Sequence, residues 1–219
     1  MAAAFSATLS LSGTAAAATP SVDWGKVVAY AHKYACNTAS GANGKCYNSA
    51  YLSFGADCTN FVSQALYAGG MPMERHSTIE YWKSEWFYDK SNDKHAKAWT
   101  SVQYFQDYFK NAKSYGTWIR ASSMGAQYTP AARGDIYMYN WGRGEGWSHL
   151  AIETGFGQFA DFVDHSTGRR YRSVTSGSGD YISQHVTDRD YSPWNWGYQT
   201  ETNPKYRRAM DTIILHWNR

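Results

Sequence analysis

The spacing of apolar residues changes once along this chain of 219 residues, and that change limits the folds it can adopt. Up to about residue 112, apolar residues recur at the three- and four-residue spacing of amphipathic helices. After it, they form short runs and alternations typical of strands, separated by glycine-rich turns. Helices followed by antiparallel strands predict an α+β fold.

Three helices and five strands are predicted. The helices are 21–35 with Ser21 as its cap, 58–68, and one from Thr100 or Ser101 to about Ala112. The strands are 135–140, 149–154, 158–165, 181–186 and 212–217. Residues 71–98 are rich in aromatic and charged residues and predict an irregular surface excursion.

Residues 1–20 carry no charge and end in an alanine run, as in the apolar core and cleavage region of a secretory signal peptide. The basic start of such a peptide is missing, so we expect a truncated N-terminus or a misplaced start codon. The segment is too short and too weakly apolar to span a membrane. Residues 21–219 then form a single predicted domain that can bury a core. We expect a secreted monomer.

Cys58 begins the helix predicted over 58–68, which ends at Gly69 and Gly70. Unpaired N–H groups and the helix dipole favour negative charge at that position, which lowers the pKa of a thiol. The alternative is a small buried hydrophobic residue, the usual place of a free cysteine. Asp57, which precedes it, predicts a side-chain cap on the helix.

The chain has three cysteines, so one disulfide leaves one thiol. Cys36 and Cys46 flank a polar, glycine-containing loop that suits a local bridge, which would stabilise the fold by about 2–3 kcal/mol. Cys58 would then be the free thiol. An unpaired thiol is a liability in an exported protein unless it is used, which favours catalysis.

His149 is the favoured partner among seven histidines because it begins a predicted strand. It alternates with the apolar Leu150 and Ile152, so it shares a sheet face with the small Ala151. That small neighbour leaves space for the helix carrying Cys58 to dock. The alternative is a surface histidine on a half-buried strand.

Five segments together resemble the family described as "Putative amidase domain", a relative of NlpC-type and CHAP-type cell-wall cysteine hydrolases. They are 57–66 (Asp-Cys-Thr-Asn-Phe-Val-Ser-Gln-Ala-Leu), 134–135 (Gly-Asp), 147–152 (Trp-Ser-His-Leu-Ala-Ile), 181–189 (Tyr-Ile-Ser-Gln-His-Val-Thr-Asp-Arg) and 193–194 (Pro-Trp). The resemblance covers most of residues 22–217. It implies a papain-like fold, with the nucleophile at a helix N-terminus packed on a C-terminal antiparallel sheet.

The resemblance also implies a catalytic pair of Cys58 and His149, with a third polar residue on the next strand. His185 is the best match by chain order, and Gln184, Asp164 and Asp188 are the alternatives. Strand alternation prevents Gln184 and His185 from both facing the site. The N–H of Cys58 and a side-chain donor, Tyr51 or Asn60, would hold the oxyanion.

The expected activity is amide hydrolysis through a thioester, on peptidoglycan stem peptides or on N-acetylmuramoyl-peptide bonds. A transglutaminase-like acyl transferase and a non-catalytic, aromatic-rich wall-binding module are the alternatives. The chain shows no C-x-x-C pair, no H-E-x-x-H and no phosphate loop, so we expect no metal and no cofactor. A net charge of +3 is poor support for a nucleic-acid partner. Tryptophans at 82, 86, 99, 141 and 147 are candidate walls of a substrate groove.

Overall fold

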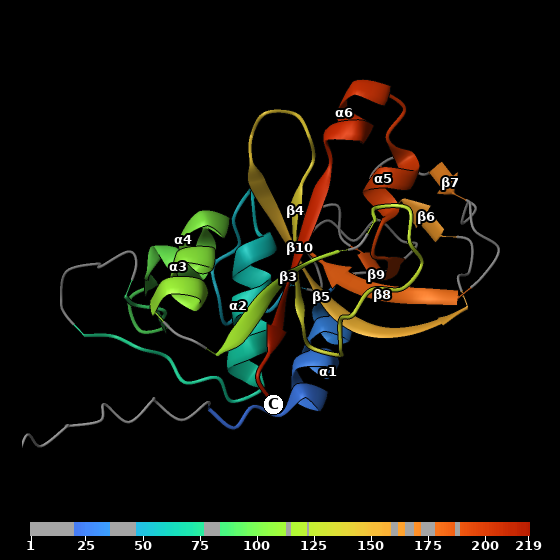
Figure 1. The fold of residues 1–219 in the computed structure, drawn as a ribbon. Helices are drawn as coiled ribbons and strands as arrows, with labels where there is room; N and C mark the ends of the chain where they lie inside the picture. The colour runs from blue at the N-terminus through green and yellow to red at the C-terminus, as the bar shows by residue number, and fades with distance from the viewer. Residues whose placement is uncertain are drawn as a thin grey trace, which may run out of the picture.

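The computed structural model describes residues 20–35, 47–76, 84–112, 115–121, 123–158, 162–164, 169–171, 178–186 and 189–219 (Figure 1). The helices are α1 (Trp24–Tyr34), α2 (Cys58–Ala68), α3 (Lys97–Thr100), α4 (Val102–Asp107), the π-helical turn η1 (Tyr108–Ala112), α5 (Trp196–Thr200) and α6 (Pro204–Ala209). The strands are β1 (Tyr88–Asp89), β2 (Lys94–His95), β3 (Gly116–Arg120), β4 (Ile136–Asn140), β5 (Trp147–Gln158), β6 (Phe162–Asp164), β7 (Arg169–Tyr171), β8 (Ser178–Gln184), β9 (Arg189–Pro193) and β10 (Asp211–Trp217).

Six of the strands form one antiparallel sheet in the order β3-β10-β4-β5-β8-β9. Helices α1 and α2 pack against each other and against β5 and β8, and Figure 1 shows α3 and α4 further out beyond α2. Helices α5 and α6 lie at the opposite end of the molecule from α1 (Figure 1). The mixed helix and antiparallel sheet architecture is as the sequence predicts.

Both faces of the sheet are covered. Successive residues of a central strand point to opposite faces and therefore lie in two different apolar clusters. In β4, Ile136 and Met138 join the cluster under the helices, whereas Tyr137 and Tyr139 join the cluster on the other face. The first cluster also contains Cys58 and Leu150. Helix α2, which begins with Cys58, is therefore part of the main core.

Helices α1 and α2 meet closely at the end of α2. The backbone N–H of Asp23 donates to the carbonyl of Gly69 at 2.8 Å. A Cβ on Gly69 would lie 2.4 Å from Val27 Cγ2, so only glycine allows this approach. The cap of α1 is Asp23, whose side chain accepts from the N–H of Lys26, and the prediction of Ser21 was wrong.

Four other parts of the structure differ from the sequence prediction. Residues 71–98 were predicted irregular, but they contain the β1–β2 hairpin, the start of α3 and a bridge between Glu74 and Trp86. The helix predicted to reach Ala112 continues from α4 as the π-helical turn η1. The strand predicted over 158–165 is divided between the end of β5 and β6. Strands β3 and β9, and helices α5 and α6, were not predicted.

Some predictions concern residues outside the described ranges. These are the signal-peptide segment up to residue 19, the disulfide between Cys36 and Cys46, and the groove role of Trp82. Among the helices of the described ranges, none combines the length and apolarity that crossing a bilayer requires.

Candidate active site

Cys58 is the first residue of α2 and is almost fully buried, with 4% of its surface exposed. The first intrahelical bond of α2 runs from the N–H of Phe61 to the carbonyl of Asp57. The N–H of Cys58 precedes that bond and has no partner within the helix. The thiol therefore lies beside backbone donors that can stabilise negative charge.

The Cys58 thiol contacts the start of β5. Burial raises the pKa of the thiol, but four interactions with three residues outweigh burial and hold that pKa below its usual range. They are the positive charge of His149, a hydrogen bond with that imidazole, the N–H of Leu150 and the hydroxyl of Thr59, 3.9 Å away. The structure thus brings the two residues of the predicted pair together, in the arrangement that makes a thiol nucleophilic.

The route by which the thiol reaches His149 differs from the prediction. Helix α2 packs on the sheet face of Leu150 and Ile152, and Ala151 lies in the cluster on the opposite face. The prediction that the helix docks on the face of Ala151 was wrong. The β5–β8 pairing begins only at Ile152, so β8 leaves the β5 edge at Leu150 open to the helix N-terminus.

The ring of His149 lies beside Tyr139 and Trp141, with ring centroids 5.9 Å and 5.7 Å away. Its Nε2 atom is buried and has no hydrogen-bond partner in the part of the chain that the structure describes. Buried polar atoms without a partner are rare in native proteins and call for an explanation. A third catalytic residue would be expected at this atom.

His185 does not lie at His149 Nε2. Its Nδ1 atom is 2.6 Å from Asp57 Oδ2, and its Nε2 atom is 2.6 Å from the carbonyl oxygen of Tyr34. The ring is stacked between Tyr47 and Phe61 and is 1% exposed. Both ring nitrogens of His185 are thus used beside Asp57, next to Cys58, rather than at His149.

Asp57 does not cap α2, contrary to the prediction, because its side chain makes no capping hydrogen bond. Its Oδ1 atom accepts from the N–H of Phe54 and from the amide of Asn60, and Oδ2 faces His185. The carbonyl of Tyr34 can only accept, so Nε2 of His185 carries a proton. With the Asp57 carboxylate as acceptor at Nδ1, the two residues form a buried ion pair.

The two candidates for the side-chain oxyanion donor differ in whether they have a hydrogen left to donate. The amide of Asn60 donates to the carbonyl of Leu52 and to Asp57, each at 2.8 Å, so both of its hydrogens are used. Tyr51 packs against Tyr88 and Trp99. Burial raises its pKa to about 12, so its phenol stays protonated at neutral pH and can donate.

The alternatives for the third catalytic residue lie in different parts of the chain's structure. Gln184 follows Ser183, which pairs with Ile152, so Gln184 lies on the same sheet face as Ala151 and His149. Its Oε1 atom accepts from the indole N–H of Trp196. Asp164 belongs to the separate two-stranded sheet of β6 and β7, and Asp188 lies outside the described residues.

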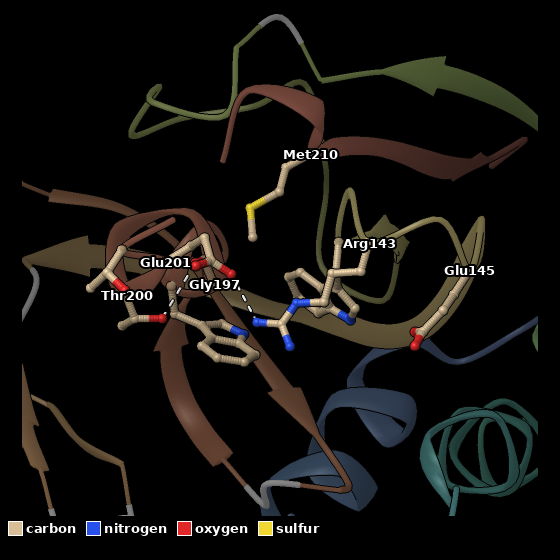
Figure 2. Close-up of a pocket in the computed structure, with 9 residues that line it drawn as sticks. Arg143, Glu145, Gly197, Thr200, Glu201 and Met210 are labelled. Atoms are coloured by element: carbon tan, nitrogen blue, oxygen red, sulfur yellow. Dashed lines mark hydrogen bonds and ion pairs between the residues drawn. The ribbon is translucent and has the colours of Figure 1, made fainter. Parts of the chain in front are cut away.

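Two cavities lie near these elements. One, of about 400 Å³, is lined by Trp141 and Trp196 and by Arg143, Glu145 and Glu201, which Figure 2 labels. Trp141 also lies beside His149, which is not part of the cavity lining. The other, of about 650 Å³, lies between α1 and the far part of β5, around Val28 and Phe156. Sequence reasoning proposed Trp141 as a groove wall but gave no sign of Trp196, Arg143 or Glu201, which only the fold brings together.

Two of the candidate tryptophans in the described ranges, Trp86 and Trp99, do not line a groove. Trp86 and Trp99 are fully buried in the main core, and Trp147 packs against that core. Within the described ranges, no three His, Cys, Asp or Glu side chains are grouped as a metal site would require.

Comparison with known proteins gives two relatives, both from Bacillus subtilis strain 168. The uncharacterized protein YhbB is 33% identical over 110 residues, which are 48% of this chain and 31% of that protein. The uncharacterized protein YjcM is 31% identical over 140 residues, 58% of this chain and 30% of that protein. The chain thus spans about a third of the length of either relative.

No solved structure matches the chain. The model of the family "Putative amidase domain" matches residues 21–208, which include both Cys58 and His149. The match covers most of the chain, and we conclude that this chain belongs to the "Putative amidase domain" family.

Proposed function

We propose that this chain is a secreted cysteine amidase that hydrolyses amide bonds of peptidoglycan, in its stem peptides or between N-acetylmuramic acid and the peptide. The observation that carries the proposal is the contact of Cys58 with His149, which lowers the pKa of a thiol at a helix N-terminus. Family membership supports amide chemistry, and the net charge of +3 favours approach to an anionic wall. A monomer with a papain-like arrangement is part of the proposal.

In the proposed mechanism, the thiolate of Cys58 attacks the amide carbonyl, and the N–H of Cys58 and the phenol of Tyr51 bind the oxyanion. The tetrahedral intermediate collapses, the C–N bond breaks, and the imidazolium of His149 gives its proton to the leaving nitrogen. Neutral His149 then takes a proton from water as it attacks the thioester. A carboxylic acid is released, and the thiolate–imidazolium pair is restored.

We assign the third role to Gln184. It lies on the strand next to β5 and on the sheet face of His149, where diagonal neighbours are about 7–8 Å apart. Its Oε1 atom accepts from the indole N–H of Trp196, and the second lone pair of that oxygen would accept from Nε2 of His149 and fix the orientation of the imidazole, as an amide does in cysteine proteases. His185 has a different role, as the charge partner of Asp57 beside the nucleophile.

The first test is a titration of thiolate absorbance at 240 nm in the folded protein, with Cys58→Ala as the blank. We expect thiolate well below the ordinary cysteine pKa of about 8.5, and its displacement to higher pH in His149→Ala. A titration that is the same in both proteins would contradict the proposed pair.

The second test is digestion of purified peptidoglycan, with new amino groups and muropeptides followed by mass spectrometry. Wild type should release amines, and Cys58→Ala and His149→Ala should lose at least about a thousandfold in rate. Incorporation of a labelled amine instead of water would indicate acyl transfer. Wall binding that Cys58→Ala retains, with no cleavage by wild type, would indicate a binding module.

A further inference from the structure

The cavity between α1 and the end of β5, here called the α1–β5 cavity, is separate from the candidate active site. Its volume is about 650 Å³, and its lining comes from α1, the segment before β4, β5, β8 and β9. Neither Cys58 nor His149 belongs to that lining. Phe156, which does, is the seventh residue after His149 on β5, so about 20 Å of strand lies between them. A ligand in this cavity therefore binds at a distance from the thiol.

Two aromatic side chains of the lining are largely open to solvent. Phe156 is 69% exposed, and Tyr191 is 56% exposed. Single exposed apolar residues are common on protein surfaces, but exposed aromatic rings that share one cavity are typical of a binding surface. The volume also lies within the range of ligand-binding cavities.

Tyr191 is fixed in place by its neighbours although its backbone is strained. Its φ of 52° lies in the left-handed region, which residues other than glycine rarely adopt. His32 stacks on the Tyr191 ring with the centroids 4.4 Å apart, and Nδ1 of His32 lies 2.7 Å from a carboxylate oxygen of Asp190. Strained backbone of this kind persists where surrounding contacts hold it, and it is concentrated at functional sites. A fixed, exposed ring also lowers the entropy cost of binding a ligand.

Arg133 gives the cavity a positive charge next to the exposed phenyl ring. A Cβ on Gly155, the residue before Phe156, would lie 3.7 Å from Nε and Nη2 of Arg133, so the guanidinium lies against this part of β5. Arg133 is exposed and has no carboxylate partner within the described ranges. Among the described residues that line the cavity, none is an aspartate or a glutamate. The lining is therefore complementary to an anion.

A sugar ring that carries a carboxylate matches both features of this lining. The C–H bonds on one face of a pyranose have a partial positive charge and pack on the negative face of an aromatic ring. A guanidinium binds a carboxylate through two parallel hydrogen bonds. An apolar peptide matches less well, because Val28 and Ala29 are the only aliphatic side chains among the described residues of the lining.

We propose that the α1–β5 cavity binds a glycan ring that carries a carboxylate, with the ring on Phe156 and the carboxylate on Arg133. The identity of the sugar rests on the proposed function, since hydrolysis between N-acetylmuramic acid and the peptide leaves a free carboxylate on that sugar. The cavity then holds the glycan strand while Cys58 acts on a bond elsewhere along it.

The test measures binding of the methyl glycoside of N-acetylmuramic acid to the full-length Cys58→Ala protein by NMR, with the methyl ester of its carboxyl group as the matched probe. We expect the acid to bind about three- to fivefold more tightly than the ester, and Arg133→Gln to remove that difference. Phe156→Ala should weaken the binding of both probes by about fivefold or more. Tyr128→Ala is the control, because Tyr128 is 48% exposed but does not line the cavity.

Three results would overturn the inference. They are equal affinity of acid and ester, binding that Phe156→Ala leaves unchanged, and tighter binding of acetylglutamate amide than of either sugar, which would indicate an acidic peptide instead.

This experiment separates the cavity from the catalytic proposal because Cys58→Ala needs no catalysis to bind a probe. Selective binding of the acid, with no hydrolysis of peptidoglycan by wild type, would leave the glycan cavity standing and remove the amidase. Hydrolysis by wild type, with no selective binding of the acid, would do the reverse.

Discussion

Two buried acids, one on each face of the sheet, have pKa values shifted in opposite directions although burial raises both. Cys58 is buried, but neighbouring donors and an imidazolium favour its thiolate, and its pKa is lowered. Glu153 is buried on the other face, where burial and the charge of Asp180 raise its pKa well above the ordinary range. Burial therefore does not decide protonation by itself, and the partners determine its direction.

Glu153→Gln should stabilise the protein relative to wild type as the pH rises. A raised pKa means that the folded state holds the proton more tightly, so the contribution of Glu153 is complete below its unfolded pKa of about 4.3. That contribution is then lost as the pH rises to the pKa of Glu153 in the folded state. Glutamine has no such proton to lose. At high pH the free energy of unfolding of the variant should therefore exceed that of wild type by about 1–3 kcal/mol. Urea unfolding at pH 4, 6 and 8 measures it.

Glu201→Gln is the matched control, and its pH dependence should have the opposite sign. The N–H of Asn203 and then Arg143 lower the pKa of Glu201. Its contribution to stability is present above the unfolded pKa and is lost as the pH falls, so the variant should lose relative stability as the pH rises. Parallel pH trends in the two variants would contradict both assignments.

Helices and strands could be predicted from the sequence where the pattern that specifies them lies within the element itself. The spacing of Phe61 and Ala65, with Gly69 after them, predicts α2 correctly, because helical contacts are three or four residues apart. Strand β9 and helix α5 lack such a signal, since their residues are buried by partners distant in sequence. The edge strand β3 is only partly buried, without an alternating pattern, and was likewise missed.

Gly69→Ala should destabilise the protein by about 1–3 kcal/mol, because its new methyl group would overlap Val27 where α1 meets α2. Gly55→Ala is the matched control, since a Cβ there meets nothing within 4 Å. That change should alter the free energy of unfolding by less than about 0.5 kcal/mol. Urea unfolding of the two variants compares them, and equal costs would mean that the α1–α2 contact adapts.

The candidate site forms only when the whole molecule is folded, because it needs α1, α2, β5 and His185, the residue after β8, to be in place together. Sequence reasoning proposed Cys58 and His149 because each begins a predicted element with a clear pattern. It could not place His185, whose partner Asp57 is 128 residues away and whose second contact is a backbone carbonyl. Every residue has a backbone carbonyl, so residue type does not reveal which carbonyl accepts a hydrogen bond. The contact of His185 with Tyr34 could therefore not be predicted from the sequence.

The Asp57–His185 pair should stabilise the folded chain because it joins the end of α1, the start of α2 and the turn after β8. Removing one partner leaves the other buried without its charge complement, so we expect Asp57→Asn and His185→Gln each to cost about 3–5 kcal/mol. The double variant should cost less than their sum, by about 0.5–3 kcal/mol. His216→Gln is the control, because His216 contacts Asp135 at a similar 2.7 Å but is 41% exposed, and the buried Asp135 keeps Arg219 at 2.8 Å as a partner. It should cost at most about 1 kcal/mol. Urea unfolding measures all four, and strictly additive costs would show that the two side chains act separately.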